Sequence, residues 1–253
     1  MSLRPTERFS ERVGDYTRHR PSYPEACVQY LCERASWRPG DHIADVGSGT
    51  GFFSKLLLDK GLRVTGIEPN PEMRAAGEHL LRDMKGFESL PTTAEATQLP
   101  DHSVVGISVA QAFHWFDLEE VRTEFQRVLR KQGFVALIWN ARRTSTPFLE
   151  AYEAHLRTHG IRYAEINHAG LPDAVFQRFY GHADFGPKIF DNAQVLDFEG
   201  LQGRHFSSSY VPSKGHPGYA PALEDLRRIF SEHEREGHVT IEYDTKVFCA
   251  QLA

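Results

Sequence analysis

The sequence predicts an α/β fold in which helices cover both faces of a largely parallel sheet. Short apolar runs alternate with segments of helical periodicity over the first 140 residues, which is the order typical of β-α-β units. Within this region, residues 43–54 join a buried strand, an acidic residue and a glycine turn to a helix. Residues 239–250 alternate β-branched and polar side chains, as a terminal strand does. A chain of 253 residues can bury all of these elements around one core.

Local signals place the elements of the first half. Asn70 followed by Pro71 predicts a helix start, because asparagine is favoured at the N-cap and proline at the first helical position. The predicted order is a helix at 24–35, a strand at 43–46, a helix at 52–60, a strand at 63–67 and a helix from 71.

The strands and helices predicted after residue 86 have signals of unequal strength. Pro91 confines the third strand to a sheet edge, and Gly106 weakens the fourth strand. Asp117 with Glu120 resembles a capping box for a helix that Gly133 ends. The predicted strands are 87–93, 103–110, 134–139 and 239–250, and the predicted helices are 118–131, 147–159 and 223–236.

The glycine turn predicts a binding site for a nucleoside-bearing cofactor. Glycines at 47, 49 and 51 allow positive φ and close approach to a ligand beside a helix N-terminus. Glu68 ends the next strand, about 20 residues after the turn, where a carboxylate suits a ribose hydroxyl pair. Strand-to-helix turns often need glycine for steric reasons alone, so the glycine turn by itself is a weak signal. The prediction depends on the turn and Glu68 together.

The order of residues in the loop distinguishes between two kinds of nucleoside-bearing cofactor. A dinucleotide loop reads G-x-G-x-x-G, whereas this loop reads Asp45-x-Gly47-x-Gly49-x-Gly51. A carboxylate at the strand end repels a pyrophosphate and attracts a cation such as an amino-acid ammonium. A nicotinamide-dependent oxidoreductase is therefore the less favoured interpretation.

The loop, together with Glu68-Pro69-Asn70, resembles the class I S-adenosylmethionine-dependent methyltransferases. Residues 93–101 resemble the adenine-contacting segment of that family. Residues 109–117 resemble the segment after strand 4 in its small-molecule branch, the methyltransferase type 11 or trans-aconitate methyltransferase-like proteins. Residues 20–24, preceded by Tyr16, resemble the N-terminal segment of the same branch.

The resemblance implies one methyltransferase domain over residues 1–253 with a Rossmann-like, doubly wound sheet of seven strands. The sheet is expected to be mostly parallel with an antiparallel last strand, and a helical insertion is expected after strand 5. The implied parts are an N-terminal segment and helix (1–36), a cofactor-binding core (37–140), an insertion on the substrate side (141–237) and a terminal strand (238–253).

The implied reaction moves a methyl group from S-adenosyl-L-methionine to a small molecule by in-line displacement and leaves S-adenosyl-L-homocysteine. A carboxylate or hydroxyl oxygen is the expected acceptor. A carboxylate arrives ionised, whereas a hydroxyl needs a base nearby. A non-catalytic protein that binds the cofactor as a regulator or partner subunit is the alternative.

Family geometry assigns the candidate residues. Glu68 is expected to bind the ribose hydroxyls, and His114 or Tyr16 is expected to act as base or to orient the acceptor. Tyr16 and Arg20 are expected to close over the methionine carboxylate or over the acceptor. The other expected cofactor contacts are Asp45, Gly47, Ser48 and Gly49 at the methionine end, Pro69, Met73, Ala94 and Glu95 at the adenine, and Gln111 and Ala112 beside the sulfonium.

Each assignment has a structural alternative. Met73 and Ala94 also suit an ordinary core, and Glu95 also suits a solvated turn. His114 also suits a brace for the helix that follows it. The N-terminal segment that holds Arg20 also suits a docking role alone.

The composition of the chain argues against several classes of binding partner. A net charge of −5 argues against a nucleic-acid substrate, and the pairs Arg142-Arg143 and Arg227-Arg228 are expected to be solvated faces. Three cysteines form neither a disulfide framework nor a zinc signature, so no metal site is expected. No apolar run reaches the ~20 residues of a membrane span, and no signal peptide is visible. A cytoplasmic monomer or homodimer is expected.

Overall fold

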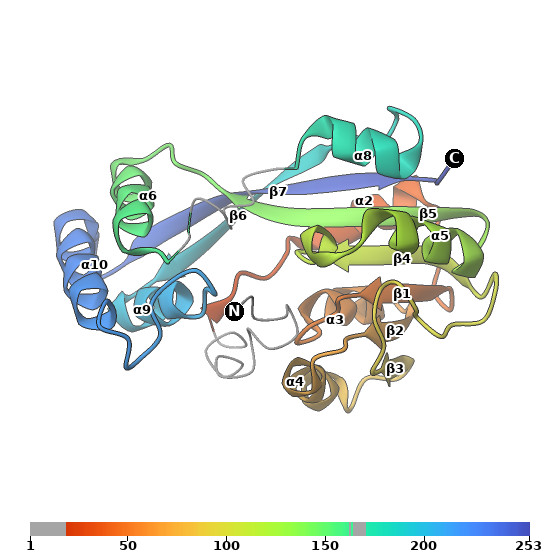
Figure 1. The fold of residues 1–253 in the computed structure, drawn as a ribbon, viewed down its shortest axis with the longest axis horizontal. Coiled ribbons are helices and arrows are strands. Elements are labelled where there is room, and N and C mark those ends of the chain that lie inside the picture. The colour runs from red at the N-terminus through yellow and green to blue at the C-terminus, as the bar shows by residue number, and fades with distance from the viewer. Residues whose placement is uncertain (1–18, 162, 164–170) are drawn as a thin grey trace.

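The computed structural model describes residues 19–161, 163 and 171–253, and its centre is a seven-stranded sheet in the order β3-β2-β1-β4-β5-β7-β6 (Figure 1). The strands are β1 (His42–Val46), β2 (Arg63–Ile67), β3 (Phe87–Leu90), β4 (Val104–Ala110), β5 (Leu129–Arg142), β6 (Lys188–Leu196) and β7 (Val239–Ala250). The pairs among β1 to β5 are parallel, while β7 is antiparallel to both β5 and β6. The predicted fold class and its antiparallel last strand are confirmed.

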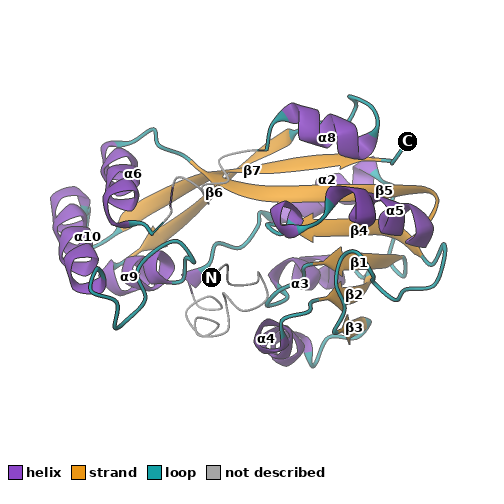
Figure 2. Cartoon of the chain, viewed as in Figure 1, coloured by secondary structure: helices purple, strands orange, loops and turns teal. Residues whose placement is uncertain are grey.

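Helices cover both faces of the sheet (Figure 2). The helices are α2 (Glu25–Arg34), α3 (Phe52–Asp59), α4 (Pro71–Leu81), η3 (Phe113–Trp115), α5 (Leu118–Val128), α6 (Pro147–His159), α8 (Asp173–Tyr180), α9 (Phe198–Phe206) and α10 (Tyr219–His233). Successive strand residues face opposite sides, so Ala44 packs in the core beneath α5 and α8, and Ile43 packs in the core beneath α2, α3 and α4.

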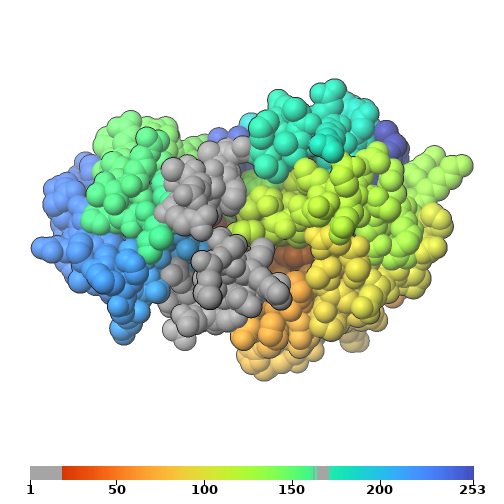
Figure 3. Space-filling model, in the orientation of Figure 1, coloured from red at the N-terminus to blue at the C-terminus, as the bar shows by residue number. Residues whose placement is uncertain are grey.

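A third core lies at the other end of the molecule, where β6 and β7 extend beyond the parallel strands. There α6, α9 and α10 pack against β7 through side chains such as Tyr152, Leu226 and Tyr243. We call these three helices the helical module. Figure 3 shows it and the parallel part of the sheet as the two ends of an elongated molecule. None of the helices described here is both long and apolar enough to cross a membrane.

The two predicted N-cap residues, Asn70 and Asp117, are confirmed, whereas Glu120 does not complete the predicted capping box. The Asn70 side chain accepts from the backbone N–H of Met73 at 2.8 Å, with Pro71 at the first helical position. The Asp117 side chain accepts from the N–H groups of Glu119 and Glu120, each at 3.1 Å. In a capping box, the Glu120 side chain would accept from the backbone N–H of Asp117. Here that N–H donates to the Glu95 side chain instead, at 3.2 Å.

Several boundaries differ from the prediction. Strand β5 runs to Arg142 rather than ending at 139, and α10 spans Tyr219–His233 rather than 223–236. Helix α5 ends at Val128 rather than Lys131, because Leu129 already pairs with Val104 in β5. The register between β4 and β5 then shifts, and Gln132 takes a φ of 68° within this irregularity. Gly133 therefore lies inside a strand instead of ending a helix.

The region predicted as a helical insertion also contains a strand, β6. Along β6 half-buried residues alternate with exposed ones, so the apolar signal is weak. Its partner β7 begins more than forty residues later in the chain, and the pairing runs from Lys188 with Val247 to Leu196 with Val239. The pairing is a long-range property, and local periodicity did not reveal it.

Gly106 in β4 makes room for Trp37. A Cβ at position 106 would lie 2.2 Å from the Trp37 ring. We expect Gly106→Ala to lower the free energy of unfolding by roughly 1–3 kcal/mol, as overpacking of a core does. Urea denaturation measures this change. Equal stability of Gly106→Ala and the unmodified protein would contradict the packing argument.

Candidate functional site

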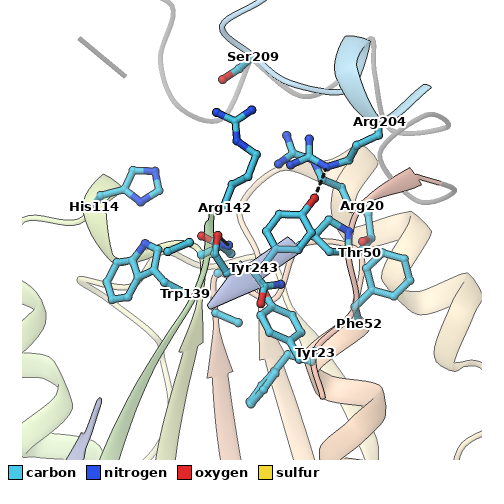
Figure 4. Close-up of a pocket in the computed structure, with 18 of the residues that line it drawn as sticks. Arg20, Tyr23, Thr50, Phe52, His114, Trp139, Arg142, Arg204, Ser209 and Tyr243 are labelled. Carbon is cyan, nitrogen blue, oxygen red and sulfur yellow. Dashed lines mark hydrogen bonds between the residues drawn. The ribbon is translucent and has the colours of Figure 1, made fainter. Parts of the chain in front are cut away.

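A cavity of about 440 Å³ opens at the carboxyl ends of β1, β4 and β5, facing the helical module (Figure 4). Ligands of parallel α/β sheets bind at this edge. Seven of the predicted residues line it: Arg20, Asp45, Gly47, Ser48, Gly49, Gln111 and His114. Glu68, Pro69, Met73, Ala94, Glu95 and Ala112 are described but are not among its lining residues. Tyr16 lies outside the described residues.

The glycine loop is built for close packing against the next segments. Gly47 has a φ of 70°, and a Cβ on it would lie 2.4 Å from the Cβ of Ala112. A Cβ on Gly49 would lie 3.4 Å from the Met73 methyl group. Ala112 and Met73 thus pack against the loop, and the loop backbone remains open toward the cavity at the start of α3.

Glu68 holds the loop in place. Its carboxylate accepts from the N–H of Gly49 and from the N–H of Asn70, each at 2.9 Å. Burial raises the pKa of Glu68, and the two backbone hydrogen bonds oppose that effect. A carboxylate has about four acceptor sites, so two backbone bonds leave capacity for ligand hydroxyls.

Asp45 is braced from both sides. Its two oxygens accept from Ser54 Oγ at 2.6 Å and from Ser108 Oγ at 2.7 Å, and the residue is 1% exposed. Burial raises the pKa of Asp45 to about 6, against the hydrogen bonds from the two serines. The carboxylate therefore ties β1 to α3 and β4 beneath the loop.

This raised pKa predicts a pH dependence of stability. The folded protein holds the Asp45 proton up to about pH 6, whereas the unfolded chain loses it near the usual 3.8. Stability from this group is thus full below pH 3.8 and falls as pH rises to 6, by an amount on the order of 3 kcal/mol. We expect the unfolding free energy of the unmodified protein, relative to Asp45→Asn, to fall between pH 4 and 6. A constant difference across that range, measured by denaturation without ligand, would contradict this account.

The N-terminal segment crosses the mouth of the cavity. The Ser22 carbonyl accepts from Asn140 at 3.2 Å and from Asn192 at 2.8 Å, which fixes the segment to β5 and β6. The Arg20 guanidinium donates to the Ser207 carbonyl at 3.1 Å and so connects the segment to the end of α9. Arg20 lines the cavity from this position.

Arg142 is not the solvated residue that the sequence predicts. Its side chain is 13% exposed, pairs with Glu153 and donates to Tyr163 Oη at 2.9 Å. The correction follows from β5, which extends to Arg142 and carries that side chain under the helical module. Arg143 pairs with Asp191 and Asp244, and Arg228 is largely exposed, as predicted.

Arg204 on α9 is a buried cation whose hydrogen-bond partners are neutral. It is 8% exposed and donates to Tyr243 Oη at 3.2 Å and to Ser208 Oγ at 3.1 Å. Within the described part of the chain, no carboxylate forms an ion pair with it. Figure 4 shows Arg142 and Arg204 directed toward the space between the labelled residues, with His114 across from Arg204.

The cavity is consequently positive on its module side. Burial acts to raise the pKa of Tyr210, yet Arg204 and Arg20 outweigh it and lower that pKa. His114 follows β4 in η3 and lines the opposite wall beside Trp115. The arrangement places a ring nitrogen and an open glycine loop on one side and arginines on the other.

Sequence reasoning missed most of the module side of the cavity. Trp139 and Asn140 had a usable signal, because they end a parallel strand next to the predicted loop. Arg204 lies in a region without clean periodicity and carried none. The missed lining residues include Tyr23, Phe52, Trp139, Asn140, Arg142, Tyr163, Arg204 and Tyr243.

Comparisons with known proteins show relatives that are named as methyltransferases. A family model described as a methyltransferase domain (Methyltransf_11) matches residues 44–137. An uncharacterised methyltransferase of Mycobacterium tuberculosis is 39% identical over 134 residues, which are 53% of this chain and 52% of the relative. The match thus spans about half the length of that relative. An uncharacterised methyltransferase-like protein of Schizosaccharomyces pombe is 30% identical over 250 residues, covering 96% of this chain and 94% of the relative.

Solved structures agree at the level of the fold. A structure named as a type II methyltransferase from Anaeromyxobacter dehalogenans superimposes with a TM-score of 0.66 at 21% identity, over 92% of this chain and 97% of that one. A geranyl diphosphate methyltransferase in complex with S-adenosylmethionine gives a TM-score of 0.51 at 16% identity, over 90% of this chain and 85% of that one.

Proposed function

The chain belongs to the class I S-adenosylmethionine-dependent methyltransferases with a type 11 domain, and from that premise we propose that its cavity methylates a small anionic molecule on a carboxylate oxygen. The observation that carries the anionic acceptor is Arg204. A buried guanidinium whose partners are neutral is costly, and an anion beside it offsets that cost. Arg142 pairs with Glu153, whereas Arg204 pairs with no carboxylate among the described residues, so we assign the ligand anion to Arg204.

The residues present fit the cofactor of this family. The open backbone at Gly47, Ser48 and Gly49 lies at the start of α3, where N–H groups and the helix dipole favour the methionine carboxylate. Glu68 keeps acceptor capacity for the ribose hydroxyls beside the same loop. Asp45 beneath the loop favours the methionine ammonium, and Gln111 lies near the expected position of the sulfonium.

The chain's own residues supply orientation and charge. The cofactor, when bound, supplies an electrophilic methyl group on sulfur. Arg204, with Arg142 and Tyr210 near it, holds the acceptor carboxylate so that one oxygen faces the cofactor site. That oxygen forms the new C–O bond as the C–S bond breaks, and the sulfur keeps the electron pair. An ionised carboxylate needs no base, so His114 orients the acceptor, and it takes a proton where the acceptor is a hydroxyl.

The size of the cavity suits this assignment. A volume of about 440 Å³ falls within the range of ~300–1,000 Å³ of small-molecule sites. Its walls combine aromatic rings, such as Trp139 and Tyr243, with the arginines. A small carboxylic acid with an apolar part would place its carboxylate at the arginines and its apolar part against the aromatic rings.

Transfer of a labelled methyl group tests the proposal. S-adenosylmethionine with a labelled methyl is incubated with the protein and a panel of small mono-, di- and tricarboxylic acids, phenols, and the matching carboxamides. We expect label in one or more carboxylic acids and none in their carboxamides, which present no anion to Arg204. Label in phenols alone would overturn the carboxylate assignment. Tight cofactor binding with no transfer to any member would favour the non-catalytic binding protein.

A further inference from the structure

The helical module holds a cluster of potential metal ligands that the proposed methyl transfer does not use. His155 and His159 lie four residues apart on α6, so they project from the same face of that helix. Asp225 lies on α10, which packs against α6. Glu153 and Arg157 of α6 line the cavity, whereas neither histidine does. The cluster is thus separate from the candidate active site.

The three side chains converge on one point. His155 Nδ1 lies 2.7 Å from Asp225 Oδ2, and His159 Nε2 lies 3.3 Å from the same oxygen. One ligand atom from each residue lies within 4.8 Å of the other two. Bond lengths of about 2.0–2.1 Å to zinc in a tetrahedral site place ligand atoms about 3.3 Å apart. The His159–Asp225 separation already equals that spacing, and the His155–Asp225 separation is shorter by about 0.6 Å.

From this geometry we infer that His155, His159 and Asp225 form a binding site for a divalent cation of the zinc type that joins α6 to α10. Two imidazoles and one carboxylate are the donor set that zinc and its neighbours prefer, whereas magnesium and calcium prefer oxygen alone. Three protein ligands leave a fourth position for water.

The surroundings support the site. The His155 side chain is 0% exposed, and those of His159 and Asp225 are 19% and 25% exposed, so the cluster is shielded on one side and open to solvent on the other. Arg228 donates to Asp225 Oδ1 at 2.7 Å, which leaves Oδ2 directed at the two histidines. When one oxygen of a carboxylate binds a metal, a hydrogen bond to the other oxygen fixes the orientation of the carboxylate. The expected consequence of metal binding is a firmer α6–α10 contact.

Cobalt absorption tests the inference with a readout independent of catalysis. The full chain, freed of metal with a chelator, is titrated with Co²⁺ and then with Zn²⁺. We expect visible d–d bands of a bound Co²⁺ at one ion per chain, and loss of those bands as Zn²⁺ displaces it. We also expect Zn²⁺ to raise the melting temperature.

Variants separate the site from adventitious binding. His159→Gln and Asp225→Asn are each expected to weaken the affinity at least ~10-fold. His238→Gln, in the turn before β7, is the control and should bind as the unmodified protein does. Unchanged S-adenosylmethionine affinity in each variant confirms that the chain is folded. Absence of one-to-one Co²⁺ binding, or equal affinity in His159→Gln and His238→Gln, would overturn the inference.

Discussion

Replacing Arg204 by methionine should lower kcat/KM for the carboxylate acceptor by on the order of 100-fold, because the buried guanidinium is the cation assigned to that anion. Its hydrogen-bond partners, Tyr243 and Ser208, are neutral, so the substitution leaves neither of them with an unpaired buried charge. The unfolding free energy should therefore stay unchanged or rise. Steady-state kinetics and urea denaturation measure the two effects separately.

A matched arginine gives the control for this variant. Arg227 lies on α10 of the same helical module, over the Phe198 ring, and is exposed. Arg227→Met should keep kcat/KM within about two-fold, and both variants should bind S-adenosylmethionine as the unmodified protein does. Equal kinetics for Arg204→Met and Arg227→Met would remove the basis of the anionic acceptor.

Replacing Glu68 by alanine should weaken S-adenosylmethionine binding by on the order of 100-fold, or about 3 kcal/mol. Two effects add. The ribose hydroxyls lose their charged acceptor, and the N–H groups of Gly49 and Asn70 lose the carboxylate that fixes the loop. Isothermal titration calorimetry measures the affinity directly.

Glu88 provides the comparison for Glu68. It lies on the edge strand β3 and is exposed, so Glu88→Ala removes the same charge without touching the loop. Glu68→Gln keeps the shape and one acceptor oxygen, and we expect it to bind with intermediate affinity. Calorimetry that shows unchanged affinity in Glu68→Ala would end the assignment of this residue.

The first half of the fold was predictable because its signals are local. The Asn70-Pro71 start of α4 and the Asp117 cap of α5 each depend on neighbours within a few residues. Strand β7 was predicted with its observed bounds, since its residues alternate from Val239 to Val247 and stay buried from there to Ala250. The predicted end of α5 was wrong because Leu129 pairs with Val104 of β4, and this pairing outweighs the helical pattern of the sequence.

The module side of the site was not predictable for a different reason. Arg204 lines the cavity only because α9 packs on β7, whose residues follow it in the chain by more than thirty positions. Arg142 was expected in solvent, and its burial depends on Glu153 and Tyr163 of another element. The cluster at 155–159 had a sequence signal in its two histidines, but the third ligand, Asp225, is seventy positions away.

A crystal structure with S-adenosyl-L-homocysteine tests the central claim most directly, because the sulfur marks where the methyl group is presented. The account predicts the homocysteine carboxylate at the glycine loop, the ribose on Glu68, and the sulfur facing the cavity that Arg204 and His114 border. A sulfur directed away from that cavity, or an adenosine occupying the space beside Arg204, would contradict it.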